Sequence, residues 1–203
     1  MGDRNFGQHP PGVRIASAAD RAQALAVLAL GFAGDPFNRW LFPDGRQYLD
    51  AFEAMADAFG GRAFEAGTAY VGGGCEGVAL WLPPGVEPDR ERLMAVILGN
   101  VSERVALELA EVGQGMGDYH ARAGDCWYLP LIAVDPIRHG CGVGARLLVE
   151  ALRRVDAEGA AAYLESSNPR NVTLYQRHGF EVMGKIQAGS SPVMVPMLRP
   201  ARR

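Results

Sequence analysis

The sequence predicts an α/β fold in which a single mixed central β-sheet is flanked by helices. Short apolar runs typical of strands alternate with longer runs of helical period along the 203 residues. A glycine-rich turn joins one apolar strand, residues 129–134, directly to a helix. Because 48 % of the residues are hydrophobic and no polar low-complexity linker interrupts the chain, we expect one domain over residues 13–203.

The first part of the chain predicts a tail, a strand and a helix. Residues 1–12 are rich in glycine, proline and polar residues, and we expect them to form a flexible tail. A short β-rich run follows at 13–16. Ser17 and Asp20 then have the spacing of a capping signal ahead of an apolar helix expected at 22–32.

A helical arm is expected before the first hairpin. It begins with an aromatic segment bracketed by prolines, residues 35–44, and continues as a helix over 46–59. The side chains expected on one face of this helix are Tyr48, Leu49, Phe52, Met55, Ala56 and Phe59.

The later elements are marked by glycine and proline. Runs at 68–71 and 76–82, joined by a glycine-rich segment, predict a β-hairpin. Helices are expected at 90–98 and 102–112, the second ending at the glycines of 113–117. After the glycine turn we expect a helix from Ala145, a strand through Tyr163, a short helix between Asn168 and Gly179, and strands near 181–186 and 193–198.

Charge and cysteine content exclude several classes of function. The net charge is −3 and no basic stripe is interleaved with aromatics, so no nucleic-acid partner is expected. The three cysteines form no Cys-x-x-Cys pair, which argues against a disulfide framework and against a bound metal. The apolar stretch at 22–33 is too short to cross a membrane, and no signal sequence precedes it. We therefore predict a soluble, cytoplasmic protein with no membrane partner.

The glycine turn has the character of a pyrophosphate site. Gly140, Gly142 and Gly144 carry no side chains that would screen the backbone N–H groups. These groups point at whatever lies at the positive end of the helix that follows, so a diphosphate binds there with little help from cationic side chains.

This turn has three other interpretations. It fits the dinucleotide pattern G-x-G-x-x-[GA], with Glu165 ending the next strand, but only 59 residues follow Gly144, too few for the rest of a nicotinamide-binding domain. A P-loop requires Gly-Lys-[Ser/Thr], which is absent from this turn. The third interpretation is a turn with a purely structural role. It does not explain why a second characteristic segment, residues 163–180, follows the turn.

That second unit reads Tyr163-Leu-Glu-Ser-Ser-Asn-Pro-Arg-Asn-Val-Thr-Leu-Tyr-Gln-Arg-His-Gly-Phe180, and the two together resemble the GNAT superfamily of acyl-CoA-dependent N-acyltransferases. The resemblance implies the GNAT fold with splayed central strands, acetyl-CoA as co-substrate and direct transfer to an amine. The family turn pattern has Gln or Arg where this chain has His139. The implied cofactor-binding residues are Leu131, Ile132, Ala133, Val134, Arg138, His139, Gly140, Cys141, Gly142, Val143, Gly144, Ala145, Asn171 and Tyr175.

Two residues are the predicted catalytic groups. Tyr175 lies where the family places its general acid, and a phenol with a pKa near ~10 is protonated at neutral pH and can donate to a thiolate. Glu165 is the candidate base at the end of the strand expected to splay, with a solvated strand-end carboxylate as the alternative. His120 is a further candidate base, and Cys141 is interpreted as part of the turn without a nucleophilic role.

Sequence segments such as Gly77-Val-Ala-Leu-Trp-Leu-Pro83 are similar to those of the puromycin N-acetyltransferase-like branch of the GNAT superfamily. This resemblance implies small-molecule amine acceptors. The expected acceptor-binding residues are Phe37, Trp40, Trp81 and Glu165, although the aromatic arm is equally compatible with core packing. A non-catalytic acyl-CoA-binding or regulatory domain, and less so a nicotinamide-dinucleotide binder, remain the alternatives. Whether the chain forms a homodimer stays open.

Overall fold

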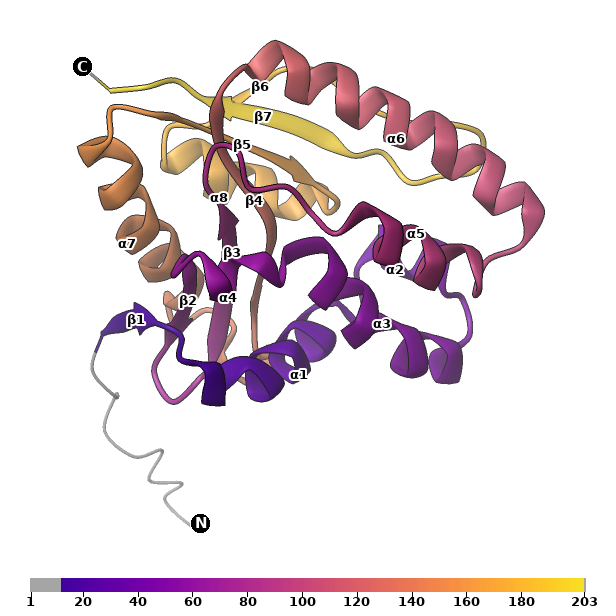
Figure 1. Cartoon of the computed structure of the whole chain (residues 1–203), viewed down its shortest axis with the longest axis horizontal. Helices are drawn as coiled ribbons and strands as arrows, with labels where there is room; N and C mark the ends of the chain where they lie inside the picture. The colour runs from indigo at the N-terminus through magenta and orange to yellow at the C-terminus, as the bar shows by residue number, and fades with distance from the viewer. Residues whose placement is uncertain (1–11, 203) are drawn as a thin grey trace.

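One open, mixed β-sheet forms the centre of the structure (Figure 1). The computed structural model describes residues 12–202, so the expected tail, apart from Gly12, lies outside the described residues. Over this range the strand order is β1-β2-β3-β4-β5-β7-β6. The strands are β1 (Val13–Ile15), β2 (Ala69–Gly72), β3 (Gly77–Leu82), β4 (Cys126–Val134), β5 (Ala161–Ser166), β6 (Glu181–Val182) and β7 (Val195–Arg199).

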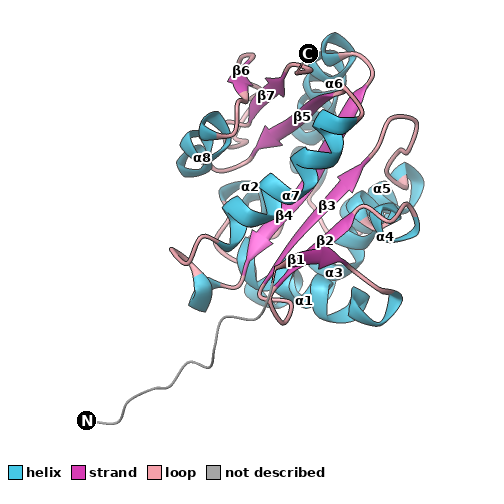
Figure 2. Cartoon of the chain, turned by 90° about the vertical axis from the view of Figure 1, so that its left-hand side faces the viewer, coloured by secondary structure: helices cyan, strands magenta, loops and turns pink. Residues whose placement is uncertain are grey.

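Helices cover both faces of this sheet, as predicted. In Figure 2, α7 lies in front of the central strands, and α1 and α3 lie behind them. Short 3-10 turns occur at Ala18–Asp20, Pro136–Arg138 and Pro169–Asn171. The helices are α1 (Arg21–Phe32), α2 (Pro36–Leu41), α3 (Gly45–Gly60), α4 (Arg62–Glu65), α5 (Arg90–Leu98), α6 (Glu103–Ala123), α7 (Val143–Ala157) and α8 (Val172–Arg177).

The hydrophobic core is divided by the sheet into two main clusters. The cluster behind the sheet packs α1 and α3 on β3 and β4 and includes Leu28, Phe52 and Leu80. The cluster in front packs α7 on the same strands and includes Trp127 and Leu147. Each such side chain contributes about 1.5–3 kcal/mol when it is fully buried, so both clusters hold the central strands in place.

The N-terminal predictions are largely confirmed. Asp20 accepts a hydrogen bond from the Ser17 backbone N–H at 2.7 Å, which completes a capping box before α1. The apolar face of α3 is buried as expected, except that the side chain of Leu49 is 67 % exposed, so its assignment to that face was wrong. Successive helical residues point about 100° apart, and Leu49 therefore turns away from the core that its neighbour Tyr48 enters.

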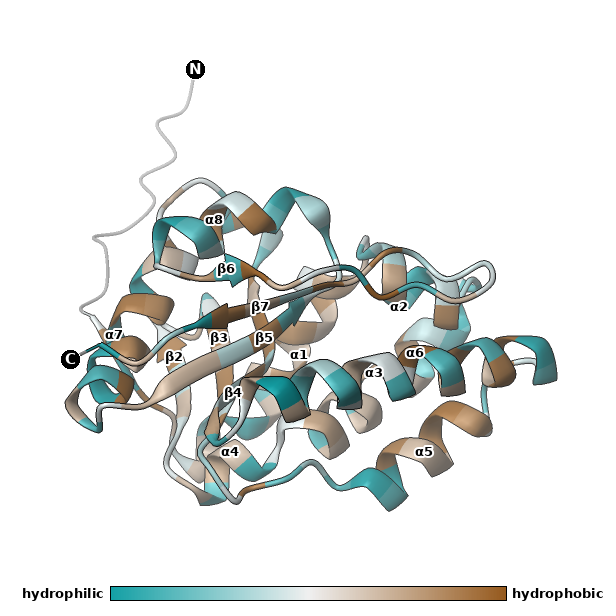
Figure 3. Cartoon of the chain, turned by 90° about the horizontal axis from the view of Figure 1, so that it is seen from above, coloured by the Kyte–Doolittle hydropathy of each residue, from teal (hydrophilic) through white to brown (hydrophobic). Residues whose placement is uncertain are grey.

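Helix α6 corrects a predicted boundary. The helix was expected to end at the glycines of 113–117, but it continues through them to Ala123. A Cβ atom on Gly115 would lie 2.9 Å from Ile186 Cγ2, so glycine permits the close packing of Ile186 on this helix. Glycine was interpreted as a helix breaker, whereas here it serves a tertiary contact. In Figure 3, α6 runs alongside β5 with hydrophilic and hydrophobic residues mixed along it.

The hairpin of β2 and β3 and the helices around the glycine turn form where they were predicted. The last two strands are shorter than expected, because β6 ends at Val182 and Ile186 makes only an isolated bridge with Met194. Among the helices of residues 12–202, none combines the length and apolar character needed to cross a membrane.

Candidate active site

The sheet opens between β4 and β5. These two strands are parallel and pair through three residue pairs, the last of which is Tyr128 with Tyr163. Beyond that point β4 continues to Val134 against β3, and β5 continues to Ser166 against β7. The backbone edges that face each other across this opening are therefore not paired with each other, which is the arrangement implied by splayed central strands.

An irregularity in β4 lies beside the opening. Leu80 pairs with Leu131 and Leu82 pairs with Tyr128, so Leu129 and Pro130 together stand opposite Trp81. One extra residue reverses the alternation of side chains along the strand. Tyr128 and Leu131 accordingly both face the α1 and α3 cluster. Side chains after the extra residue therefore face the opposite side of the sheet from the one they would face in a regular strand.

A cavity of about 950 Å³ lies against the far end of β4. Its walls are the end of α1 with Asp35, the backbone and side chains of residues 132–134, the glycine turn, and α8. This volume is at the upper end of the range for small-molecule sites. The cavity brings together the predicted residues Ile132, Ala133, Val134, Arg138, His139, Gly140, Gly142, Val143, Gly144, Ala145, Asn171 and Tyr175.

The glycine turn in this cavity has the geometry of an anion site. Gly140 and Gly142 adopt φ angles of 79° and 73°, in the left-handed region that favours glycine. Gly142 is also the N-cap of α7 and supplies no side-chain cap. The first N–H groups of a 15-residue helix are thus left to bind an anion. The residues present fit a pyrophosphate group.

The side chains nearest this turn are partly engaged with the protein itself. Arg138 forms an ion pair with Glu76 at 2.8 Å, and His139 Nε2 lies 3.1 Å from the carbonyl oxygen of Val134. Arg170 and Arg177 also line the cavity, and the sequence analysis did not single them out. The position of Arg170 between Pro169 and Asn171 was the available signal. These four side chains supply positive or hydrogen-bonding groups around the backbone site.

Two predicted cofactor-binding residues do not line this cavity. The side chain of Leu131 is buried in the cluster with α1 and α3 because the irregularity at Pro130 turns it to that face. Cys141 is exposed on the outer side of the turn, with its Sγ 3.9 Å from the His139 carbonyl oxygen.

Tyr175 lies on α8 and reaches this cavity from a buried position. Its ring packs edge-on against Phe180 at a centroid distance of 6.1 Å. Burial raises the pKa of its phenol well above the usual value, and the charge of Asp35 raises it further. The hydroxyl is therefore protonated across the physiological range and is available as a donor. Asn171, at the N-cap of α8, makes no side-chain capping bond, whereas Asn168 caps the preceding 3-10 turn by accepting the Arg170 N–H at 3.1 Å.

Asp35 connects two segments that flank the cavity. Its Oδ1 caps α2 by accepting from the Phe37 and Asn38 N–H groups, and its Oδ2 accepts from Ser167 Oγ at 2.6 Å. This buried carboxylate therefore ties the start of α2 to the end of β5. The sequence analysis did not single out Asp35, although an Asp directly before a proline is a typical N-cap.

Replacing Asp35 with alanine is expected to cost about 2–3 kcal/mol of unfolding free energy, because a cap and a buried hydrogen bond to a charge are lost together. Urea denaturation measures this loss. Asp44 caps α3 in the same way from an exposed position, so Asp44→Ala should cost only about 1 kcal/mol. Equal losses in the two variants would contradict a role for the bond to Ser167.

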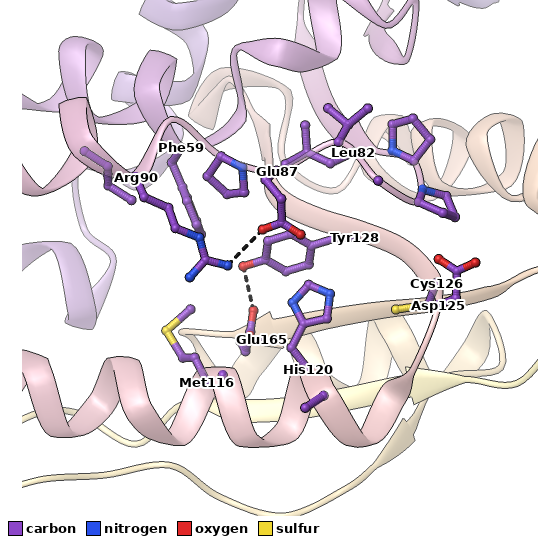
Figure 4. A pocket seen from close by; sticks show the side chains of 18 of the residues that line it. Phe59, Leu82, Glu87, Arg90, Met116, His120, Asp125, Cys126, Tyr128 and Glu165 are labelled. Carbon is purple, nitrogen blue, oxygen red and sulfur yellow. Dashed lines mark hydrogen bonds and ion pairs between the residues drawn. The ribbon is translucent and has the colours of Figure 1, made fainter.

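Glu165 lies on β5 at the other end of the opening and lines a second cavity of about 540 Å³. Figure 4 shows the hydroxyl of Tyr128 directed at its carboxylate, and Tyr128 donates a hydrogen bond to Glu165 Oε2 at 2.8 Å. Burial raises the pKa of Glu165 to about 7, while the hydroxyls of Tyr128 and Tyr163 favour its ionised form. A carboxylate with this pKa exchanges protons near neutral pH.

His120 shares this second cavity with Glu165. Its ring lies 4.9 Å from the ring of Tyr128 and 5.0 Å from that of Tyr163, measured between centroids. Burial lowers the pKa of His120, so the imidazole is neutral at physiological pH. His120 therefore lies beside Tyr128 and lines the same cavity as the candidate base Glu165.

The other expected acceptor-binding residues lie elsewhere. Trp81 is fully buried in the cluster beneath α7 and lines neither cavity. The rings of Phe37 and Trp40 on α2 lie 5.3 Å apart between centroids in a tilted arrangement, and Trp40 Nε1 donates to Ser190 Oγ at 3.1 Å. These two residues also line neither cavity, and they pack partly on the core, which is the alternative that the sequence left open.

Comparisons with known proteins agree with this arrangement. The family model described as an acetyltransferase (GNAT) domain matches residues 103–182, which contain β4, the glycine turn, β5 and α8. A solved structure described as histone acetyltransferase HPA2 and related acetyltransferase, from Corynebacterium glutamicum, is 27 % identical. It matches with a TM-score of 0.68 over 96 % of this chain and 98 % of that chain.

Two more distant structures share the fold. A polyamine N-acetyltransferase of Drosophila melanogaster is 16 % identical, with a TM-score of 0.64 over 92 % of this chain and 97 % of that chain. A mosquito arylalkylamine N-acetyltransferase like 5b is also 16 % identical, with a TM-score of 0.57 over the same shares of the two chains.

Proposed function

We propose that this chain is an N-acetyltransferase of the GNAT superfamily and that it transfers an acetyl group from acetyl-CoA directly to the primary amine of a small molecule, and the match of residues 103–182 to the GNAT family model supports this proposal. The observation that carries this proposal is the opening between β4 and β5. A cavity with a protonated Tyr175 lies at one end of it, and a cavity with the carboxylate of Glu165 lies at the other.

The residues of the larger cavity would hold the co-substrate. The N–H groups of the glycine turn and the start of α7 would bind the pyrophosphate, and the unpaired edge of β4 would hydrogen-bond the pantetheine amides as an added strand does. Asn171 would contact the same arm. Arg170 and Arg177 add positive charge near the turn.

Acyl transfer needs a neutral amine and a proton for the departing sulfur. A primary amine has a pKa near ~10.4 and is largely protonated at neutral pH. Glu165, with a pKa of about 7, would accept the proton that the amine loses. The C–N bond then forms as the C–S bond breaks, and Tyr175 would donate its proton to the thiolate.

The size of the acceptor is proposed from the second cavity. A volume of about 540 Å³ suits a small molecule. Solved structures with the same fold include proteins described as acting on polyamines and arylalkylamines. The sequence segments that resemble the puromycin N-acetyltransferase-like branch also support a small-molecule amine as the acceptor.

A thiol-release screen tests this function. Acetyl-CoA is offered with polyamines, arylalkylamines, aminonucleosides, amino acids and lysine peptides, and at least one free small amine is expected to release CoA and become acetylated. If acetyl-CoA binds by calorimetry but no acceptor is turned over, the chain is a non-catalytic acyl-CoA binder. If only peptides are acetylated, the small-molecule assignment fails.

The cofactor site is tested by replacing Gly142 with valine. The φ angle of 73° strains any L side chain at this position, and a branched one would also obstruct the N–H groups. Calorimetry is expected to show acetyl-CoA binding weakened at least tenfold, or about 1.4 kcal/mol. Gly159, just past the other end of α7 with φ at 63°, is a matched control. The Gly159→Val variant carries the same strain and should bind normally.

A further inference from the structure

The second cavity lies between α5, α6 and the connection from β3 to α5. In Figure 4, Met116 and His120 rise from α6 toward Tyr128 and Glu165, and Phe59 and Arg90 lie across from them. None of these walls belongs to the aromatic segment at 32–42, which the sequence predicted as one boundary of the acceptor site, whereas the other predicted boundary, Glu165, does line this cavity. The apolar lining includes Phe59, Leu82, Val86, Leu93, Met94 and Met116.

The charges in this cavity are mostly negative. Among the described residues that line it, Glu87, Asp125 and Glu165 carry carboxylates, and Arg90 carries a guanidinium. Arg90 is already paired with Glu87 at 2.8 Å. His120 is held neutral by burial. The electrostatic character therefore favours a cation and disfavours an additional carboxylate.

The two cavities approach each other along the same strands. On β4 the smaller cavity reaches Tyr128 and the larger one begins at Ile132, four residues on, or roughly 13 Å along a strand. On the other side Glu165 lines one cavity and Asn168 lines the other. Molecules that enter from opposite ends would therefore meet at the opening between β4 and β5.

We propose that the cavity between α5 and α6 is the acceptor pocket, that it takes a primary amine on an apolar body without a carboxylate, and that Met116 limits the size of that body. This inference rests on the proposed acetyl transfer. The ammonium group lies at Glu165, and the apolar body contacts the side chains of Phe59, Leu93 and Met116. Amines leave and enter past the exposed pair of Glu87 and Arg90.

Filling the pocket tests its location. Met116→Trp is expected to raise the KM for the amine at least tenfold and to leave the KM for acetyl-CoA within twofold of the wild type. Leu107 lies on the same helix with 65 % of its side chain exposed and does not line the cavity. Leu107→Trp is therefore the matched control, with both KM values unchanged. Met94→Trp, which narrows the pocket from α5, should reproduce the effect if Met116→Trp folds poorly.

A matched pair of probes tests the chemistry of the pocket. 2-Phenylethylamine and phenylalanine share the amine and the ring and differ by a carboxylate. The kcat/KM for 2-phenylethylamine is expected to exceed that for phenylalanine at least tenfold. Equal or faster turnover of phenylalanine, especially if Arg90→Gln abolishes it, would overturn the proposed acceptor class. So would an inert 2-phenylethylamine in an enzyme that acetylates polar amines.

Failure of this inference is distinguishable from failure of the proposed function. If no amine is acetylated, the transfer itself is refuted. If amines are acetylated while Met116→Trp and Met94→Trp leave the amine KM unchanged and Trp40→Ala raises it, the acceptor enters beside α2. The enzyme function would then stand and the pocket assignment would not.

Discussion

Replacing Tyr175 with phenylalanine is expected to lower kcat by roughly 10²- to 10⁴-fold, the usual effect of removing a general acid. The physical reason is that the hydroxyl is needed when the thiolate departs, whereas the ring supplies the packing against Phe180. The dissociation constant for acetyl-CoA should change by about twofold at most. Single-turnover kinetics with calorimetry separate these two effects.

Tyr70 provides a control for this experiment. It is buried in the same cluster as Tyr175, and burial raises the pKa of its phenol as well, but it does not line the cofactor cavity. Tyr70→Phe should therefore leave kcat unchanged. Near-normal single-turnover rates in Tyr175→Phe would remove this residue from the proposed mechanism.

Replacing Glu165 with glutamine is expected to lower kcat/KM at pH 7 by about 10²-fold or more, because the substitution keeps the shape and removes the base. In the wild type, kcat/KM should rise with pH as Glu165 ionises around its pKa of about 7. The hydroxyls of Tyr128 and Tyr163 act on this carboxylate, and His120 and Arg90 line the same cavity. The variant should lose the titration near pH 7, as a pH series with the amine of the screen would show.

The same pKa shift predicts an effect on stability. Burial holds the pKa of Glu165 above its ordinary value of 4.5, so the folded state keeps a proton that the unfolded chain releases. The contribution of Glu165 to the free energy of unfolding is therefore fully present below pH 4.5 and is lost as the pH rises to about 7. Glu165→Gln should show less loss of unfolding free energy between pH 5 and pH 8 than the wild type.

Glu158 is a suitable control for the Glu165 experiments. It accepts a hydrogen bond from Trp127 Nε1 at 2.9 Å but is exposed and lines neither cavity. Glu158→Gln should leave both the rate and the pH profile unchanged. A Glu165→Gln variant with the same pH profile as the wild type would exclude Glu165 as the base.

The geometry of the proposed cofactor site was predictable from the sequence because it depends on local structure. Glycines at 140, 142 and 144 between a strand and a helix determine a turn with free N–H groups, whatever the rest of the fold does. The contiguous segment from Asn168 to Gly179 likewise places Asn171 and Tyr175 on one short helix. Within each of these two features, the residues that matter lie within about a dozen positions of one another in the chain.

The proposed acceptor site was not predictable in the same way. Trp81 was expected near the acceptor because of its type, but the alternation of β3 places it beneath α7. The main chain of Leu131 was expected to contact the cofactor, whereas the direction of its side chain, toward α1 and α3, follows from the extra residue at Pro130. A shift of one residue in register moves a side chain to the other face of the sheet, and the amino-acid composition does not predict such a shift.

The sequence by itself determined the α/β order of elements, the glycine turn and the resemblance to the GNAT superfamily, because these depend on short-range patterns of apolar and glycine residues. The tertiary structure decided which distant side chains meet. It brings Tyr128 of β4, Glu165 of β5 and Met116 of α6 to one cavity, and it ties Asp35 to Ser167 across another. Such contacts arise from the packing of helices on the two faces of one sheet, and residues 49 positions apart, such as Met116 and Glu165, meet only once that packing is complete.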